Sequence, residues 1–330
     1  MGITIGPLRF SFLILKLRLS RLFQAVMPKS HARLQAKNTV QRLQTLADFL
    51  SLDEPIMIVD VGANPMHFDA PYKSLLDADL CKVIGFEPQK EAFDKLENQK
   101  GPQETYINTA VGDGQTHIFY EYAADGLQSL YKLDPAAKNI FDFLNDPDGE
   151  IYQTLSADPI ATRRIDDMDE IPQIDFLKID IQGGELAVFQ NARQKLRDTI
   201  AIQTEMRFCR IYEDEPLFGE VDIELNNQGF EMHNIFEAPR RFRMPHAHVA
   251  KTTNHCVKQL LDNDFIYVRG LRALDEADAL KLKKLAVLAD GVFQSFDLAL
   301  YCIDLLAKNG NAPEGLAHKY RQMLPLKYIK

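Results

Sequence analysis

An apolar run that ends in an acid and a glycine is the feature that most constrains this fold. Residues 56–64 read Ile56-Met57-Ile58-Val59-Asp60-Val61-Gly62-Ala63-Asn64, which is typical of a buried parallel strand that enters a tight turn. A second run, Val83-Ile84-Gly85-Phe86, is followed by Glu87. A glycine turn after one strand and an acid after the next is an arrangement that holds a nucleoside-bearing cofactor.

Strand and helix patterns alternate along most of the chain. Strands are expected at residues 56–61, 82–87, 104–111, 116–122 (as an edge), 174–181, 199–205, 230–236 and 264–269. This alternation predicts a doubly wound, Rossmann-like sheet of about seven strands, mostly parallel, with ligands at the carboxyl ends of the strands. Residues 123–162 have only a weak pattern, so we expect a long loop that helps to form the acceptor side.

Three segments follow from these patterns. Residues 1–50 are predicted to be a basic, helical N-terminal segment, residues 51–270 the cofactor-binding domain, and residues 271–330 a helical C-terminal extension. Within the extension, helical periodicity over residues 274–308 is interrupted at Gly291.

Charge and cysteine content limit the partners and the compartment. The net charge of -9 argues against nucleic acid, although residues 1–47 contain no Asp or Glu. The basic, amphipathic residues 1–30 could contact a membrane surface or pack on the main domain or a second subunit, and the sequence leaves both open. The four cysteines are scattered and no run is long enough to span a bilayer. We therefore expect a cytoplasmic protein, with peripheral contact at the inner face of the membrane left open.

Four expected strand ends each carry an acid. These residues are Asp60, Glu87, Asp180 and Glu205. In a parallel sheet the carboxyl ends of the strands lie on the same side, so these acids are expected close together. An ionised Glu87 has two acceptor oxygens for a ribose diol, and Gly62 lets the backbone approach a ligand.

Five ordered motifs resemble those of the FkbM-type methyltransferases, which use S-adenosylmethionine. They are Asp60-Val61-Gly62-Ala63-Asn64, Gly85-Phe86-Glu87-Pro88, Asn108-Thr109-Ala110-Val111-Gly112-Asp113, the block from Lys178 to Glu185, and the later landmarks Tyr212 to Phe218 with Gln228-Gly229-Phe230. The resemblance covers about residues 40–270 and is most specific in the Lys178–Glu185 block. Where the first motif of the family usually continues with a second glycine, this chain has Pro65-Met66.

The resemblance implies the fold of a class I methyltransferase and a set of site residues. The residues expected to bind S-adenosylmethionine are Asp60, Gly62, Asn64, Glu87, Pro88, Ala110, Val111, Asp113 and Asp180. Asp180 and Glu185 are expected in the active centre, with Glu205 as the candidate base and His233 as a second candidate.

Each catalytic candidate also has a structural interpretation. Glu185 could simply favour the first turn of a helix, Glu205 could be structural, and His233 could be a core or rim histidine. Lys178 could pair with a neighbouring acid. His246, His248, His255 and Cys256 lie close in sequence, but their irregular spacing favours a loop over a metal site.

The sequence therefore predicts a methyltransferase, and the family resemblance implies that its acceptor is a hydroxyl of a sugar, a glycan- or lipid-linked precursor or a secondary metabolite. Two alternatives stay open. One is a non-catalytic cofactor-binding or interaction module on the same fold. The other is a nucleotide-dependent oxidoreductase or epimerase, although the fuller glycine fingerprint of that class is absent. A homodimer is also left open.

Overall fold

The computed structural model describes residues 29–64, 69–124, 126–141, 144, 152–235 and 259–325. Its centre is a seven-stranded sheet with the order β3-β2-β1-β7-β8-β10-β9. The strands are β1 (Ile56–Val61), β2 (Cys81–Phe86), β3 (Glu104–Ile107), β7 (Phe176–Ile179), β8 (Ala201–Arg207), β9 (Phe230–Ile235) and β10 (Asp262–Arg269). Only β10 is antiparallel to its neighbours, so the predicted mostly parallel sheet is confirmed.

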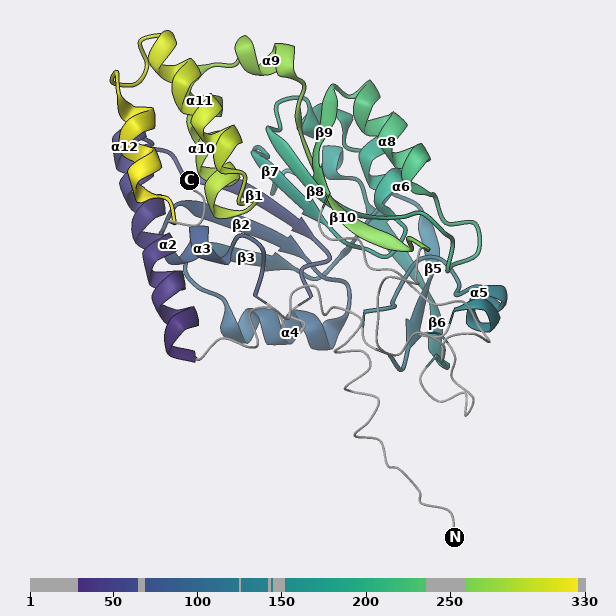
Figure 1. Cartoon of the computed structure of the whole chain (residues 1–330). Helices are drawn as coiled ribbons and strands as arrows, with labels where there is room; N and C mark the ends of the chain where they lie inside the picture. Colours follow the sequence, from purple (N-terminus) through teal and green to yellow (C-terminus); the bar gives the residue numbers. More distant parts are fainter. Residues whose placement is uncertain are drawn as a thin grey trace.

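Helices cover both faces of this sheet (Figure 1). One face packs against α2 (Lys29–Leu50), α3 (Lys73–Asp77), α10 (Ala279–Gly291), α11 (Phe296–Lys308) and α12 (Leu316–Met323). The other packs against α6 (Glu185–Gln190), α7 (Arg193–Leu196) and α8 (Phe218–Asn227). Alternate residues of β1 enter the two cores: Ile56 and Ile58 the first, Val59 and Val61 the second. This alternation explains the continuous apolar run, because both faces of a central strand are buried.

The remaining elements lie at the margins of these layers. Helix α4 (Lys90–Gln99) contacts β3, and α9 (Leu271–Asp275) connects β10 to α10. The break expected at Gly291 is where α10 ends, and α11 returns against α10. None of the helices in the described residues is both long and apolar enough to cross a membrane.

A second, three-stranded sheet with the order β4-β6-β5 corrects part of the strand prediction. The expected strand at 104–111 splits into β3 and β4 (Ala110–Val111), and β5 (Thr116–Tyr122) belongs to the second sheet, not to the edge of the main one. The stretch 123–162 is not a plain loop either, because it contains α5 (Pro135–Ile140) and most of β6 (Thr154–Arg163).

Pro159 explains why β6 is hard to recognise from the sequence. It pairs with Ile118 on β5, whereas β4 reaches only Thr162 and Arg163 of β6. Within the described parts of the chain no strand pairs with the other side of β6 at Pro159, and an unpaired side is where a strand tolerates proline.

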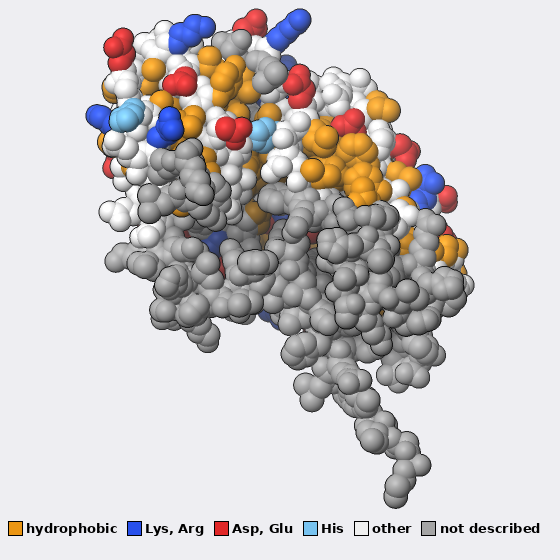
Figure 2. Space-filling view, viewed as in Figure 1, with side chains coloured by type: hydrophobic (Ala, Val, Ile, Leu, Met, Phe, Trp, Pro, Cys, Tyr) orange, Lys and Arg blue, Asp and Glu red, His pale blue; other side chains and the backbone are white. Residues whose placement is uncertain are grey.

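The edge strand β9 leaves apolar side chains at the surface. Met232 and Ile235 are 49% and 43% exposed, and apolar side chains gather on this side of the molecule in Figure 2. The basic residues 1–28 lie outside the described residues, so contact with a membrane and dimer formation stay predictions.

A buried ion pair joins the N-terminal helix to the C-terminal helices. Arg42 Nε and Nη2 donate to Asp290 Oδ2 and Oδ1 at 2.9 and 2.8 Å, and the Tyr320 hydroxyl donates to Asp290 Oδ2 at 2.8 Å. Asp290 is 1% exposed, so removal of its partner leaves a buried charge uncompensated.

We predict that Arg42→Met lowers the free energy of unfolding by about 3–5 kcal/mol, as measured by urea denaturation. The matched control is Arg163→Met, because Arg163 also forms a two-pronged pair, with Glu170, but both side chains are more than 40% exposed. That control should cost at most about 1 kcal/mol. Equal losses for the two variants would contradict the prediction.

Candidate functional site

The turn after β1 is pressed against the end of β7. Gly62 has φ +80°, and a Cβ added there would lie 2.1 Å from the carbonyl oxygen of Asp180. The N–H groups of Gly62 and Ala63 both donate to the carbonyl oxygen of Phe86, at 3.0 and 3.1 Å. Glycine is therefore required twice, for its left-handed backbone and for the close approach.

Lys178 holds this turn in place. Its Nζ donates to the Gly62 carbonyl oxygen at 3.0 Å and lies 3.0 Å from Asp60 Oδ1. The Tyr72 hydroxyl donates to Asp60 Oδ2 at 2.6 Å. Burial opposes the charged form of Lys178, but Asp60 and then Asp180 outweigh it and raise the pKa of Lys178. The ammonium thus stays charged and joins the ends of β1 and β7, which confirms that Lys178 pairs with a neighbouring acid.

Glu87 follows β2 and is 3% exposed. Its Oε1 accepts from the Gln89 N–H at 2.8 Å. Asn108 Nδ2 donates to the carbonyl oxygens of Glu87 and Pro88, at 2.8 and 2.9 Å, and so fixes the backbone at this strand end. Burial raises the pKa of Glu87 to about 7, against the lowering effects of the Gln89 N–H and Lys178. The carboxyl can therefore change its ionisation near neutral pH.

One side-chain amide joins Asp180, which follows β7, to Glu205, which was expected to end its strand but lies two residues before the end of β8. Gln182 Nε2 donates to Asp180 Oδ1 at 2.7 Å and to Glu205 Oε2 at 2.8 Å. Burial and the charge of Asp180 raise the pKa of Glu205 well above its ordinary value, although Arg207 lowers it. Asp180 and Glu205 thus form a pair of acids at the carboxyl ends of the parallel strands.

Glu185 serves the loop between β7 and α6. Its Oε1 accepts from the Ile181 N–H and its Oε2 from the Gly183 N–H, both at 2.9 Å. Burial raises the pKa of Glu185 to about 7, while the hydrogen bond from Ile181 lowers it. Both oxygens hold the loop in place, and the catalytic role expected for Glu185 stays a prediction.

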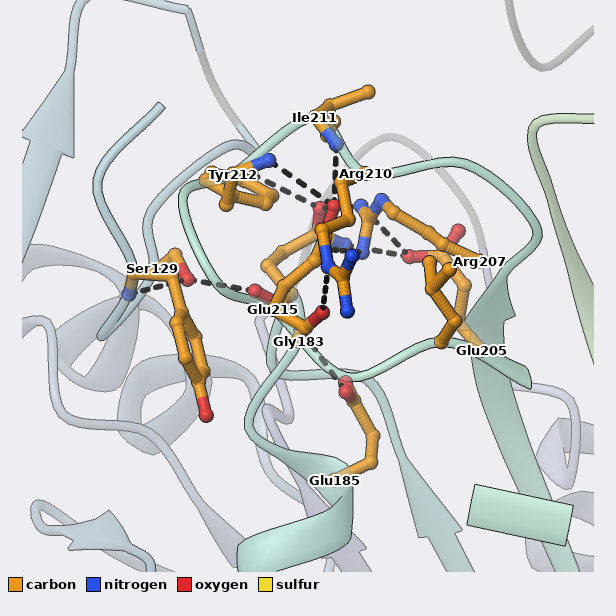
Figure 3. Close-up of polar contacts among 12 residues, drawn as sticks. Ser129, Gly183, Glu185, Glu205, Arg207, Arg210, Ile211, Tyr212 and Glu215 are labelled. Carbon is orange, nitrogen blue, oxygen red and sulfur yellow. Dashed lines mark hydrogen bonds and ion pairs between the residues drawn. The ribbon is translucent and has the colours of Figure 1, made fainter. Parts of the chain in front are cut away.

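Arg207 is the cation of the same region, and Figure 3 shows it between two acids. Its guanidinium lies 3.5 Å from both Glu205 and Glu215, and its Nη2 donates to Gln182 Oε1 at 2.6 Å. Burial lowers the pKa of Arg207, but Glu215 and Glu205 outweigh it, so that the pKa is raised. Glu215 in turn accepts from the N–H groups of Ile211 and Tyr212.

The other residues predicted to bind the cofactor make contacts of their own. Ala110 and Val111 form β4 and pair with β6. The Asp113 carboxylate accepts from the Gln115 N–H and contacts His117 Nε2 at 2.8 Å, contacts that lower its pKa against the effect of burial. Asn64 follows the glycine turn and is half-buried. The cofactor roles of these residues stay predictions.

His233 lies on β9, which two strands separate from β7 in the order β7-β8-β10-β9. Its Nε2 contacts Ser295 Oγ at 2.8 Å, beside the start of α11. Burial lowers the pKa of His233. The structure therefore does not bring His233 together with Asp180, and its use as a base stays a prediction.

Two predictions fall on residues that the structure does not describe. Pro65 and Met66, where a second glycine was expected, belong to them, and so do His246, His248, His255 and Cys256. Among the residues that it does describe, no group of His, Cys, Asp and Glu side chains could hold a metal ion.

Several functional contacts were missed from the sequence. Tyr72, Asn108, Gln182 and Arg207 all bond to the predicted acids or to their backbone. Gln182 stands within the strongest motif, and Arg207 lies two residues after Glu205 on the same strand, so their positions offered a signal.

The strand order defines the class of protein. Strands β2 and β3 lie on one side of β1 and β7 and β8 on the other, so the chain reverses its direction of winding beside the Gly62 turn. An acid follows β2, and the antiparallel strand β10 lies between the parallel strands β8 and β9. Together these features define a Rossmann-like fold of the class I methyltransferase type.

Comparison with protein families identifies the family. The family described as "Methyltransferase FkbM domain" matches residues 60–232, more than half of the 330-residue chain, and the chain belongs to it. Membership implies S-adenosylmethionine as the methyl donor, as the sequence predicts. A search of curated proteins finds no match.

Solved structures similar to this chain are distant. Magnesium protoporphyrin IX methyltransferase from Synechocystis PCC 6803 with bound SAM is 7% identical and has a TM-score of 0.33, with coverage of 82% of this chain and 100% of that one. A putative S-adenosylmethionine-dependent methyltransferase from Listeria monocytogenes is 9% identical, with a TM-score of 0.35 and coverage of 69% and 98%. Likeness at this level identifies neither a substrate nor a mechanism.

We predict that Gly62→Ala destabilises the protein more than Gly310→Ala does in urea unfolding. Gly310 is the matched control, because it has φ +73° but nothing within 4 Å of an added Cβ. The control should lose about 1–2 kcal/mol from the left-handed backbone alone. Gly62→Ala has the same backbone cost, and its added Cβ also forces the ends of β1 and β7 apart. Equal losses would show that the close approach to Asp180 is unimportant.

Proposed function

We propose that this protein transfers a methyl group from S-adenosylmethionine to a hydroxyl oxygen. The proposed acceptor is a sugar, a glycan- or lipid-linked precursor, or a secondary metabolite. The observation that carries the proposal is the acid pair Asp180 and Glu205, from the neighbouring strands β7 and β8, joined by Gln182 at 2.7 and 2.8 Å. An alcohol needs a proton acceptor during methylation, and a carboxyl with a raised pKa is suited to that task.

The residues around the switch point fit the cofactor. Gly62 brings the backbone of the β1 turn to the end of the sheet, and Glu87 offers a carboxylate of which Oε1 already accepts one backbone N–H. We assign Glu87 to the ribose hydroxyls. Asp180 follows β7, next to that turn, and its negative charge suits a cationic sulfur. The donors and acceptors present therefore match an adenosyl sulfonium compound.

The bound cofactor supplies a methyl group on a positively charged sulfur, and its transfer to an acceptor oxygen releases the hydroxyl proton and leaves a neutral thioether. Glu205 is the residue that we assign to accept this proton. The acids also disfavour anionic acceptors, and two cations beside them are already paired, Lys178 with Asp60 and Arg207 with Glu205 and Glu215. Alignment of the two reactants accounts for most of the expected acceleration.

Calorimetry tests the proposed cofactor without knowledge of the acceptor. We expect S-adenosylhomocysteine to bind and NAD to show no heat of binding at the same concentrations. Binding of NAD instead would favour the oxidoreductase alternative. Transfer of a labelled methyl group to a panel of glycan, lipid-linked and small-molecule hydroxyl acceptors then tests the reaction. Binding without transfer to any of them would favour the non-catalytic module.

We predict that Glu87→Gln weakens S-adenosylhomocysteine binding by about 1–3 kcal/mol, because a neutral amide replaces a charged acceptor. The pKa of Glu87 is raised to about 7, and the ribose hydroxyls favour the ionised carboxylate. Wild-type affinity should therefore rise as the pH increases through about 7, and this rise should be reduced in Glu87→Gln. Titration calorimetry at several pH values measures both effects. Unchanged affinity in the variant would refute the ribose role.

A further inference from the structure

Gln182 occupies a costly backbone conformation between β7 and α6. Its φ is +59°, in the left-handed region that residues with a side chain rarely adopt. It is followed by two glycines, Gly183 and Gly184, either of which would accept that conformation more easily. A side chain retained at such a position indicates that its contacts compensate for the backbone strain.

The contacts of Gln182 use every polar atom of its side chain. Nε2 donates to Asp180 Oδ1 at 2.7 Å and to Glu205 Oε2 at 2.8 Å. Oε1 accepts from Arg207 Nη2 at 2.6 Å, and the Tyr212 hydroxyl, which donates to the Leu127 carbonyl oxygen at 2.9 Å, lies 3.4 Å from it. The orientation of the amide is settled by chemistry, because the reverse orientation would place its oxygen against two carboxylates and its NH2 against a guanidinium.

The backbone of Gln182 is anchored as well. Its carbonyl oxygen accepts from Ser129 Oγ at 2.6 Å, and Glu185 holds the N–H groups on either side of it, those of Ile181 and Gly183. The residue is only 8% exposed. The amide therefore has little freedom to leave the two acids.

We propose that Gln182 is a positioning residue that fixes the Glu205 carboxylate beside Asp180 in its ionised, proton-accepting form. The inference rests on the proposed function in that it assumes Glu205 to be the base. Each N–H of the amide serves one carboxylate, so the two acids can lie close together without sharing a proton. Arg207 polarises the amide from its oxygen side and strengthens both donations.

The charges around Glu205 show why this donor matters. The groups that act on it from the surrounding elements are Asp180 on β7, Arg207 on β8, Asp262 and Asp264 on β10, and Tyr212 after β8. Three of these are acids that favour protonation of Glu205, against one cation. A hydrogen bond donated to the carboxylate favours its ionised form, and Gln182 provides this donor at 2.8 Å.

The test replaces the amide with an apolar side chain of similar length, in Gln182→Met. Protein labelled with 13C at the glutamate carboxyl is titrated by NMR, and the Glu205 resonance is assigned by its loss in Glu205→Gln. Without the donor, we expect the Glu205 midpoint to move to higher pH by about one unit, a roughly tenfold fall in the ionised ratio at a given pH.

The matched control is Gln228→Met. Gln228 Nε2 also donates twice, to Phe189 O and Glu224 Oε1, but at the end of α8 and away from Glu205. It should cost stability without moving the Glu205 midpoint. A merely structural role for Gln182 would lower stability in the same way and leave the midpoint unchanged.

A second variant covers the case in which Gln182→Met does not fold. Gln182→Leu removes both donors without adding a charge, so the midpoint should again rise. A midpoint equal to or below that of the wild type in the folded variant overturns the proposal. Because the readout is a titration of the protein alone, this failure is distinct from a failure to bind S-adenosylhomocysteine.

Discussion

The ammonium of Lys178 is the constraint on which the site depends. It joins Asp60 and the carbonyl oxygen of Gly62 on β1 to the end of β7, where the direction of chain winding reverses. This contact holds the glycine turn against the Asp180 carbonyl, so the position of the turn and of Asp180 are set together. The side chain of Lys178 is 15% exposed and that of Asp60 is 5% exposed. Loss of either residue would therefore leave the charge of the other buried and poorly compensated.

Burial of the site's carboxyl groups lowers the stability of the fold by an amount that depends on pH. Burial is the main cause that raises the pKa of both Glu87 and Glu185 from 4.5 to about 7. Between these values the folded protein binds protons that the unfolded chain has released, so each group lowers stability as the pH rises through this window. A bound ligand that favours the ionised Glu87 would offset part of this cost, which couples cofactor binding to folding.

The architecture was predictable because its signals are local and physical. The apolar run at β1 is buried on both faces, and the parallel order follows from the alternation of strands and helices. The second sheet was not predictable in the same way. Its strand β6 contains Pro159 and is mostly exposed, so neither hydrophobic alternation nor strand propensity identifies it. Its pairing with β5 is a tertiary contact that no local pattern encodes.

The acids of the site were predictable, but their partners were not. Glu87, Asp180 and Glu205 could be placed at one edge because parallel strands end together, whereas the hydrogen bonds of Gln182 and Arg207 depend on side-chain directions in a left-handed loop. The same loop shows how a strained residue can be informative. Glycine at position 182 would relieve the backbone but remove the amide that links the Asp180 and Glu205 side chains. The retention of glutamine there, next to two glycines, is best explained by what its amide does for the two acids.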